Sequence, residues 1–131
     1  IDVYNNGNHS RDFTYVDDIV EGIYLSSISK KELIDSNFDS KDPSRSFCKS
    51  IIFNLGRGKP ENLEDFIDEI ENNLGKRAKR NLMPLQPGDV PDTSADISGL
   101  KDFSGYEPKT SIKIGVKNFI DWYKEYYKVN L

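Results

Sequence analysis

Apolar side chains recur at every third or fourth position in three long stretches of the chain, which is the spacing of one helix face. The first stretch begins at Val16, the second lies between Asn62 and Gly75, and the third begins near Ser111. Asn62 suits a helix N-cap, and Gly75 suits the position after a helix because glycine tolerates positive φ. The pattern predicts three helices, and the first is expected to bury its apolar stripe. The apolar positions are Val16, Ile19, Val20, Ile23 and Tyr24 in the first helix, Leu63, Phe66, Ile67, Ile70 and Leu74 in the second, and Ile112, Val116, Phe119, Ile120, Tyr123 and Tyr127 in the third.

Shorter apolar or extended stretches predict three strands, at residues 1–4, 50–55 and 79–83. A short helix is expected over residues 96–103, ended by Gly105. Strands and helices therefore alternate, which favours an α/β fold, although three short strands do not complete a doubly wound sheet. Because the chain opens on a strand and without Met, we interpret residues 1–131 as a single lobe of a longer protein whose other strands lie upstream.

Residues 30–50 are mostly polar and charged, and they predict a flexible surface loop. Cys48 lies at the edge of this loop and has no neighbour in sequence that would activate its thiol. With one cysteine in the chain no internal disulfide can form, and one cysteine with one histidine does not make a zinc site. We therefore expect no metal.

Charge and hydropathy narrow the class of partner. The chain has 18 basic and 22 acidic side chains and a net charge of -4, and only residues 76–80 concentrate positive charge. Nucleic-acid binding needs a wider basic face, so nucleic acid is not expected, and residues 76–80 are interpreted as a solvated turn. No apolar run approaches the ~20 residues of a membrane helix, and no secretory signal is visible, so a cytoplasmic protein without a membrane partner is expected.

The loop from Gly56 to Glu61 follows a predicted strand and precedes a helix, as a dinucleotide-binding turn does. Glu61 stands where the fingerprint needs a third glycine, and no Lys-Ser or Lys-Thr pair follows, so the loop is not a Walker loop either. The incomplete fingerprint favours an ordinary strand-to-helix turn that lines a cleft.

Two further loops carry side chains suited to ligand binding. Arg11 precedes a helix and offers a planar fork of donors for a phosphate, although a pair with a neighbouring carboxylate is the simpler interpretation. Asp89 follows Gly88 in a turn, where it can accept bonds from sugar hydroxyls or bond its own backbone. No tyrosine has a lysine four residues later, and His9 lies in an Asn/Gly turn where we expect it to be exposed. We therefore identify no catalytic residue.

Taken together, several motifs resemble a known family in order and spacing. They are Arg11-Asp12-Phe13-Thr14-Tyr15-Val16-Asp17-Asp18, Phe53-Asn54-Leu55-Gly56, Leu85-Gln86-Pro87-Gly88-Asp89-Val90, Thr93-Ser94-Ala95-Asp96 and Gly105-Tyr106-Glu107-Pro108. Nearly the whole chain resembles the C-terminal third of sugar epimerases of the extended short-chain dehydrogenase/reductase family. The likeness is greatest to UDP-glucuronate 4-epimerases and least over residues 30–50.

This resemblance implies a fold and an activity. Such enzymes bind NAD in an N-terminal Rossmann domain, oxidise and re-reduce C4 of the sugar, and interconvert UDP-glucuronate and UDP-galacturonate for polysaccharide biosynthesis. The chain would be their α/β C-terminal substrate-binding lobe, without the Rossmann core. Its partners would be a UDP-sugar and the N-terminal domain of the same protein, and the full-length protein would be a homodimer. The lobe alone would bind no NAD and would be inactive.

The resemblance also assigns roles to individual residues. Arg11 would contact the pyrophosphate, Phe13 would border the nucleotide, and Asp89 would bind the ribose hydroxyls. Lys59 lies where a residue of the uridine cleft is expected. Many relatives have an arginine at the position of Gln86, so the second phosphate contact would be a neutral hydrogen bond in this chain.

Two alternatives remain open at this stage. One is a different reaction of the same superfamily, a nucleotide-sugar 4,6-dehydratase or decarboxylase. The other is a non-catalytic binding or interaction module. An isolated lobe would expose the apolar surface that faced its partner domain, so self-association is also expected, through strand edges at residues 1–4 or Phe53.

Overall fold

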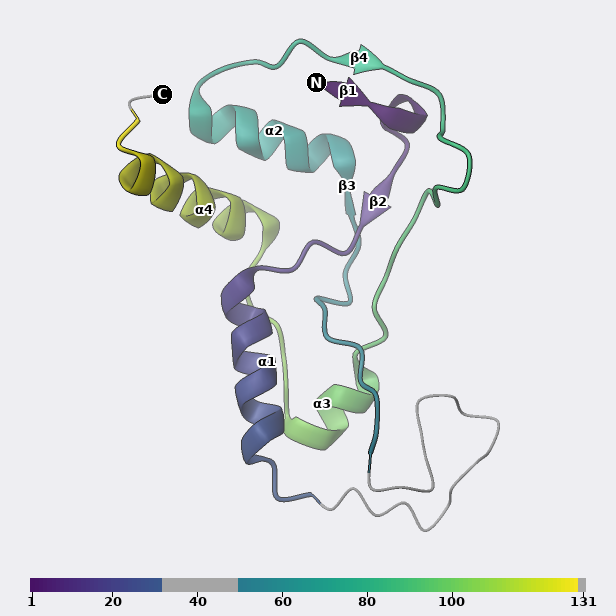
Figure 1. Ribbon diagram of the computed structural model, residues 1–131, viewed down its shortest axis with the longest axis vertical. Coiled ribbons are helices and arrows are strands. Elements are labelled where there is room, and N and C mark those ends of the chain that lie inside the picture. Colours follow the sequence, from purple (N-terminus) through teal and green to yellow (C-terminus); the bar gives the residue numbers. More distant parts are fainter. Residues whose placement is uncertain (32–49, 130–131) are drawn as a thin grey trace.

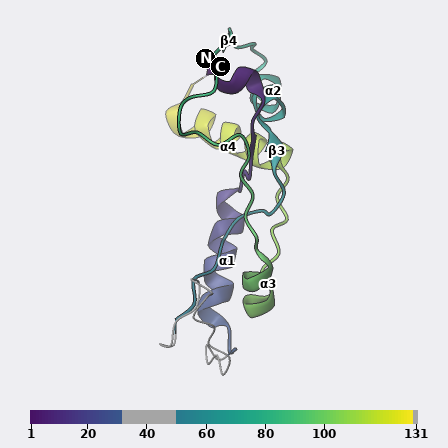
Figure 2. The ribbon, with the colours of Figure 1, turned by 90° about the vertical axis from the view of Figure 1, so that its right-hand side faces the viewer.

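The computed structural model describes residues 1–31 and 50–129. The predicted loop at 30–50 lies almost wholly outside the described residues. The elements, in order, are β1 (Asp2–Val3), η1 (Tyr4–Gly7), β2 (Ser10–Arg11), α1 (Val16–Ile28), β3 (Glu61–Asn62), α2 (Leu63–Leu74), β4 (Asn81–Leu82), α3 (Ser98–Ser104) and α4 (Ile112–Tyr127). Figure 1 shows an elongated molecule with α2 and α4 in one half and α1 and α3 in the other, and Figure 2 shows the same division from the side. The predicted mixed α/β lobe is confirmed.

The strands form two short ladders that join distant parts of the chain. β1 pairs in parallel with β4, with Asp2 opposite Asn81. β2 pairs antiparallel to β3, with Arg11 opposite Glu61. The strands expected at residues 1–4 and 79–83 are therefore present but shorter, whereas β2 and β3 were not predicted.

The strand predicted at residues 50–55 is wrong. Apart from an isolated bridge at Ile51, this segment has no strand structure in the described residues, and Ile52 is 71% exposed. Side chains hold the segment instead: Phe53 stacks on Phe103 with ring centroids 5.0 Å apart, and the Asn54 amide donates to the Asp96 carbonyl. The Phe53 ring thus packs against Phe103 of α3, and this contact holds the segment in place of a strand ladder.

The helix ends follow local sequence signals. The Asn62 side chain accepts a bond from the Glu64 N–H (2.9 Å), Gly75 adopts φ 68° after α2, and the Ser111 hydroxyl accepts from Ile114 N–H at the start of α4. α2 and α4 pack against each other, and the buried apolar side chains of this half are Val3, Ile67, Val116 and Ile120. The three long helices predicted from the sequence are confirmed.

The core of the other half is built around Tyr106, which is fully buried. Its hydroxyl donates to the Gly56 carbonyl (2.9 Å), and its ring lies against α1 at Gly22. A Cβ at Gly22 would lie 2.4 Å from Cδ1 of Leu55 and 3.0 Å from the Tyr106 ring, so only glycine fits without a shift of its neighbours. A tyrosine and a glycine therefore bring α1, the Gly56 loop and the segment after α3 together.

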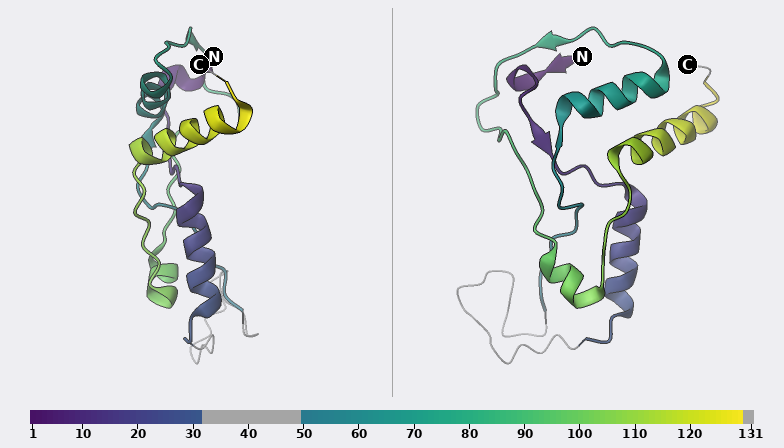
Figure 3. Two further views of the ribbon diagram at one scale, coloured as in Figure 1. Left: turned by 90° about the vertical axis from the view of Figure 1, so that its left-hand side faces the viewer. Right: turned by 180° about the vertical axis from the view of Figure 1, so that it is seen from behind.

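The predicted burial of the α1 stripe is wrong. Val16, Val20, Ile23 and Tyr24 are each about 60% exposed, while α1 buries Asp18 and Gly22. Asp18 is buried because its carboxylate accepts three bonds from residues 109–110: the Lys109 N–H, and the N–H and hydroxyl of Thr110. Figure 3 shows this segment running beside α1 on its way to α4. α1 thus faces the rest of the chain with Asp18 and Gly22, and it leaves Val16, Val20, Ile23 and Tyr24 exposed.

Lys76, Arg77 and Lys79 are exposed after α2, as the prediction of a solvated turn requires, but the segment is also bonded to that helix. Buried Glu71 of α2 accepts bonds from the Arg77 side chain (2.6 Å) and the Ala78 N–H (2.9 Å), and Arg80 lies 3.2 Å away. Half-buried Arg80 also bonds Glu64 and Asp68. This network fastens the segment that leads into β4 onto α2.

The acid stability of the chain should depend on Glu71. Its bonds from Arg77 and then Ala78 lower its pKa from 4.5 to about 2, against the effect of burial. Since the pKa is lower in the folded state, the carboxylate stabilises the fold above pH 4.5, and this contribution is lost as the pH falls toward about 2. Glu71→Gln should therefore flatten the fall of the urea midpoint over this pH range. Glu125→Gln, an exposed change on α4, should follow the wild type; a steep acid dependence retained in Glu71→Gln would contradict the assignment.

Candidate functional site

Arg11 and Asp89 lie side by side although they are 78 positions apart in the sequence. The Arg11 guanidinium donates from one terminal nitrogen to Asp89 Oδ1 (3.1 Å) and from the other to the Pro91 carbonyl (2.7 Å). The two side chains are 28% and 35% exposed, so their pair is accessible from solvent. The structure therefore brings together two residues that the sequence assigned to one binding site.

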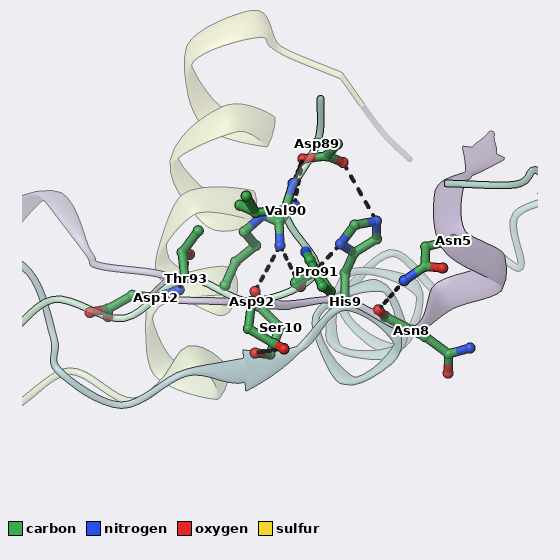
Figure 4. A network of polar contacts seen from close by, with 11 residues as sticks. Asn5, Asn8, His9, Ser10, Asp12, Asp89, Val90, Pro91, Asp92 and Thr93 are labelled. Atoms are coloured by element: carbon green, nitrogen blue, oxygen red, sulfur yellow. Dashed lines mark hydrogen bonds and ion pairs between the residues drawn. The ribbon is translucent and has the colours of Figure 1, made fainter. Parts of the chain in front are cut away.

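Backbone bonds explain why these segments meet. Ser10 N–H donates to the Pro91 carbonyl (3.0 Å), Thr93 N–H donates to the Ser10 carbonyl (3.2 Å), and the Ser10 hydroxyl donates to Asp92 (2.6 Å). The Val90 N–H donates to Asp89 Oδ1 (2.8 Å) and orients that carboxylate toward Arg11. Figure 4 shows residues 89–93 beside Ser10 of β2.

His9 is buried, so the prediction of an exposed histidine is wrong. It is 5% exposed; Nδ1 lies 3.1 Å from the Pro91 carbonyl, and Nε2 lies 3.6 Å from Asp89 Oδ2 (Figure 4). Asn5 and Asn6 adopt positive φ, as residues of Asn/Gly turns do. After this turn the chain brings His9 into contact with Pro91. Burial arises from a contact with residues about 80 positions away, which no local pattern reveals.

Asp12 is a structural residue of the site that the sequence did not identify. Its carboxylate accepts from three backbone N–H groups, those of Arg57 (3.1 Å), Gly58 (2.9 Å) and Ala95 (2.9 Å). Two of these donors belong to the loop that resembles a dinucleotide-binding turn. The N–H groups that would bind a cofactor phosphate already bind a carboxylate of the chain, so a dinucleotide pyrophosphate does not fit this loop.

Phe13 lies against α2 beside an apolar cleft. Its ring stacks on Phe66 with centroids 4.1 Å apart and planes 5° from parallel. The cleft has a volume of about 250 Å³, and its lining includes Tyr15, Ile70 and Phe119 from three different segments. Phe13 therefore lines this apolar cleft, two residues along the chain from Arg11.

Lys59 and Gln86 are placed differently from the Arg11–Asp89 pair. Lys59 is exposed on the rim of a second, more polar cleft of about 460 Å³, together with Arg57, Lys101 and Lys109. No bond within the described residues joins it to Arg11 or Asp89. Gln86 is exposed, and its backbone carbonyl accepts from Asp89 N–H (3.1 Å) across the turn at Gly88. Gln86 thus shapes the Asp89 turn through its backbone.

Other classes of site are not found in the described part of the chain. Within residues 1–31 and 50–129, no group of three His, Cys, Asp or Glu side chains is arranged to hold a metal ion. None of the helices in those ranges is long and apolar enough to span a bilayer.

No protein-family model matches the chain, but individual relatives do. Protein CapI of Staphylococcus aureus is 48% identical over 131 residues, 98% of this chain and 39% of that protein. The probable UDP-glucuronate 4-epimerase of Rhizobium meliloti (strain 1021) is 36% identical over 132 residues, 98% of this chain and 38% of that protein. The chain thus spans about two fifths of the length of these relatives.

A solved structure gives the same result. The UDP-glucuronic acid 4-epimerase from Bacillus cereus, in complex with UDP-glucuronic acid and NAD, superposes with a TM-score of 0.74 and 27% identity. The match covers 97% of this chain and 36% of that one. Sequence and structure therefore select the same group of relatives.

Proposed function

We propose that the chain, which is similar over 98% of its length to part of a probable UDP-glucuronate 4-epimerase, forms the lobe that binds the UDP portion of a UDP-sugar in such an enzyme. The observation that carries the proposal is the accessible pair of Arg11 and Asp89. One residue supplies a planar cation for phosphate, and its neighbour supplies an anion for hydroxyl groups.

The site works by exchange of partners. The diphosphate takes the Arg11 guanidinium from Asp89, and the freed carboxylate accepts bonds from the ribose hydroxyls. Phe13 borders the nucleotide, and Gln86 offers a neutral donor to the phosphates. Lys59 belongs to the uridine end of the ligand. The Asp89 carboxylate thus serves Arg11 as a counter-ion only until the ligand arrives.

The proposal for the whole protein is an NAD-dependent epimerase that interconverts UDP-glucuronate and UDP-galacturonate. NAD would accept and return the C4 hydride, held by a Rossmann domain outside these 131 residues. Two observations support this division: no tyrosine of the chain has a lysine four residues later, and Asp12 occupies the Gly56–Gly58 loop. The chain alone is then inactive. The outward apolar face of α1 is the surface suited to the Rossmann domain of the same protein.

Calorimetry with UDP tests the proposal. Arg11→Ala should weaken UDP binding by about tenfold to a hundredfold, because a hydrogen-bonded contact to a charged group contributes about 1.5–3 kcal/mol. Arg11→Lys keeps the charge but loses the planar fork of donors, so its affinity for UDP should lie between those of the wild type and Arg11→Ala. Uridine, which lacks phosphates, should lose no affinity in Arg11→Ala.

Lys113→Ala is the matched control, since it removes an exposed cation on α4 that makes no contact with the pair within the described residues. Its affinity for UDP should equal that of the wild type. Equal UDP affinities of wild type and Arg11→Ala would refute the assignment of Arg11.

A further inference from the structure

His9 has an unusual environment for a polar side chain. It is only 5% exposed, and among the described residues its Nε2 has no hydrogen-bond partner. A buried polar atom without a partner costs free energy, so its retention calls for an explanation. The nearest polar group is the Asp89 carboxylate, whose Oδ2 is 3.6 Å from Nε2.

The ring orientation leaves only one use for Nε2. Nδ1 lies 3.1 Å from the Pro91 carbonyl, which can only accept, so a hydrogen bond there requires the ring hydrogen on Nδ1. A neutral ring then presents a lone pair to the carboxylate, which cannot bind it, whereas a doubly protonated ring presents an N–H. Only the doubly protonated ring can hold Asp89.

Arg11 and His9 approach the same carboxylate through different oxygens. Arg11 donates to Asp89 Oδ1 and to the Pro91 carbonyl, and His9 contacts Oδ2 and that same carbonyl. These are the charged side chains that the described contacts bring to the ring; the start of α2 contributes a backbone bond, from Leu63 N–H to the His9 carbonyl (2.9 Å).

Resting on the proposed function, we propose that His9 is a positioning residue that takes over Asp89 when UDP engages Arg11. The diphosphate draws the guanidinium away, Nε2 takes one proton from solvent, and the imidazolium closes on Oδ2. The Val90 N–H keeps its bond to Oδ1. The carboxylate therefore stays in place to receive the ribose hydroxyls after losing its first cation.

The ring can be observed directly, because His9 is the one histidine of the sequence. Nitrogen-15 spectra of the ligand-free 131-residue chain at constant pH should show a neutral ring in the wild type, with well-separated ring signals. In Arg11→Ala the two signals should converge, as in an imidazolium. In Arg11→Ala/Asp89→Asn they should separate again, because the anion is gone. A ring that responds to Arg11→Ala equally with and without Asp89 overturns the proposal.

UDP supplies the second arm. Saturating UDP should shift the wild-type ring toward the imidazolium pattern. His9→Phe, which keeps a flat ring without nitrogens, should weaken UDP binding about tenfold, whereas His9→Gln, which keeps a side-chain N–H, should restore most of the affinity. Equal UDP affinities of His9→Phe and the wild type overturn the proposal. Failure of the wild type to bind UDP contradicts the proposed function instead, and the ligand-free spectra then decide on His9.

Discussion

Tyr106→Ala should destabilise the chain by about 4 kcal/mol, the scale of large-to-small changes at buried aromatic side chains. The ring is fully buried and fills the space left by Gly22 between α1 and the Gly56 loop. Removal of the ring leaves a cavity, and it also leaves the buried Gly56 carbonyl without its donor. The loss should be measured as the change in unfolding free energy in urea at pH 7.

Two further variants divide this effect into its parts. Tyr106→Phe removes only the hydroxyl and should cost about 1–2 kcal/mol, which also gives a graded value if Tyr106→Ala is wholly unfolded. Burial, and then the negative charges of Asp18, Asp12 and Glu21, raise the Tyr106 pKa to about 12, so the hydroxyl keeps its proton at pH 7 and donates. Tyr126→Ala, at a 66% exposed position, should change stability by less than about 0.5 kcal/mol. Similar losses in Tyr106→Ala and Tyr126→Ala would contradict the central role of Tyr106.

Asp12→Ala should cost about 3 kcal/mol. The half-buried carboxylate accepts from three backbone N–H groups in two separate loops, and truncation leaves these donors without a partner. The same urea titration measures the loss. Because residues 56–58 and 93–95 are both tied to Asp12, their amide hydrogens should also exchange faster in the variant.

Asp17→Ala is the matched control for Asp12→Ala. Asp17 is an exposed carboxylate in the first turn of α1, where its interaction with the helix dipole is worth about 0.3–1 kcal/mol. Asp12→Asn keeps one acceptor oxygen and should lie between the alanine variant and the wild type. If Asp12→Ala cost no more than Asp17→Ala, the three backbone bonds would not hold the loops together.

Features that depend on neighbours in sequence were predicted well. The N-cap at Asn62, the stop at Gly75 and the start at Ser111 each rest on a side chain or backbone within one helical turn, so the sequence is sufficient to locate them. The α/β character followed from the same patterns. The pairing of β2 with β3 was missed because two residues of each strand carry no detectable alternation.

Features that depend on distant contacts were not predicted. The burial of His9 arises from residues about 80 positions away, and the Asp12 carboxylate is bonded to residues 45, 46 and 83 positions away. The α1 stripe has the periodicity of a buried face, but periodicity does not say whether the covering surface belongs to the same chain. An acid directly after Arg11, with a Gly-x-Gly loop downstream, was the one available signal for Asp12.

The pairing of Arg11 with Asp89 has a consequence for selectivity among small anions. A site that keeps its own counter-ion offers no net charge to chloride, sulfate or free phosphate, which must displace Asp89 from Arg11 and bring no vicinal hydroxyls for that carboxylate. A nucleoside satisfies Asp89 but cannot displace it from Arg11. On the proposed function, only a molecule that carries phosphate and vicinal hydroxyls at the right separation satisfies both groups at once. Molecules that carry only phosphate, or only vicinal hydroxyls, should then bind the lobe more weakly than a molecule that carries both.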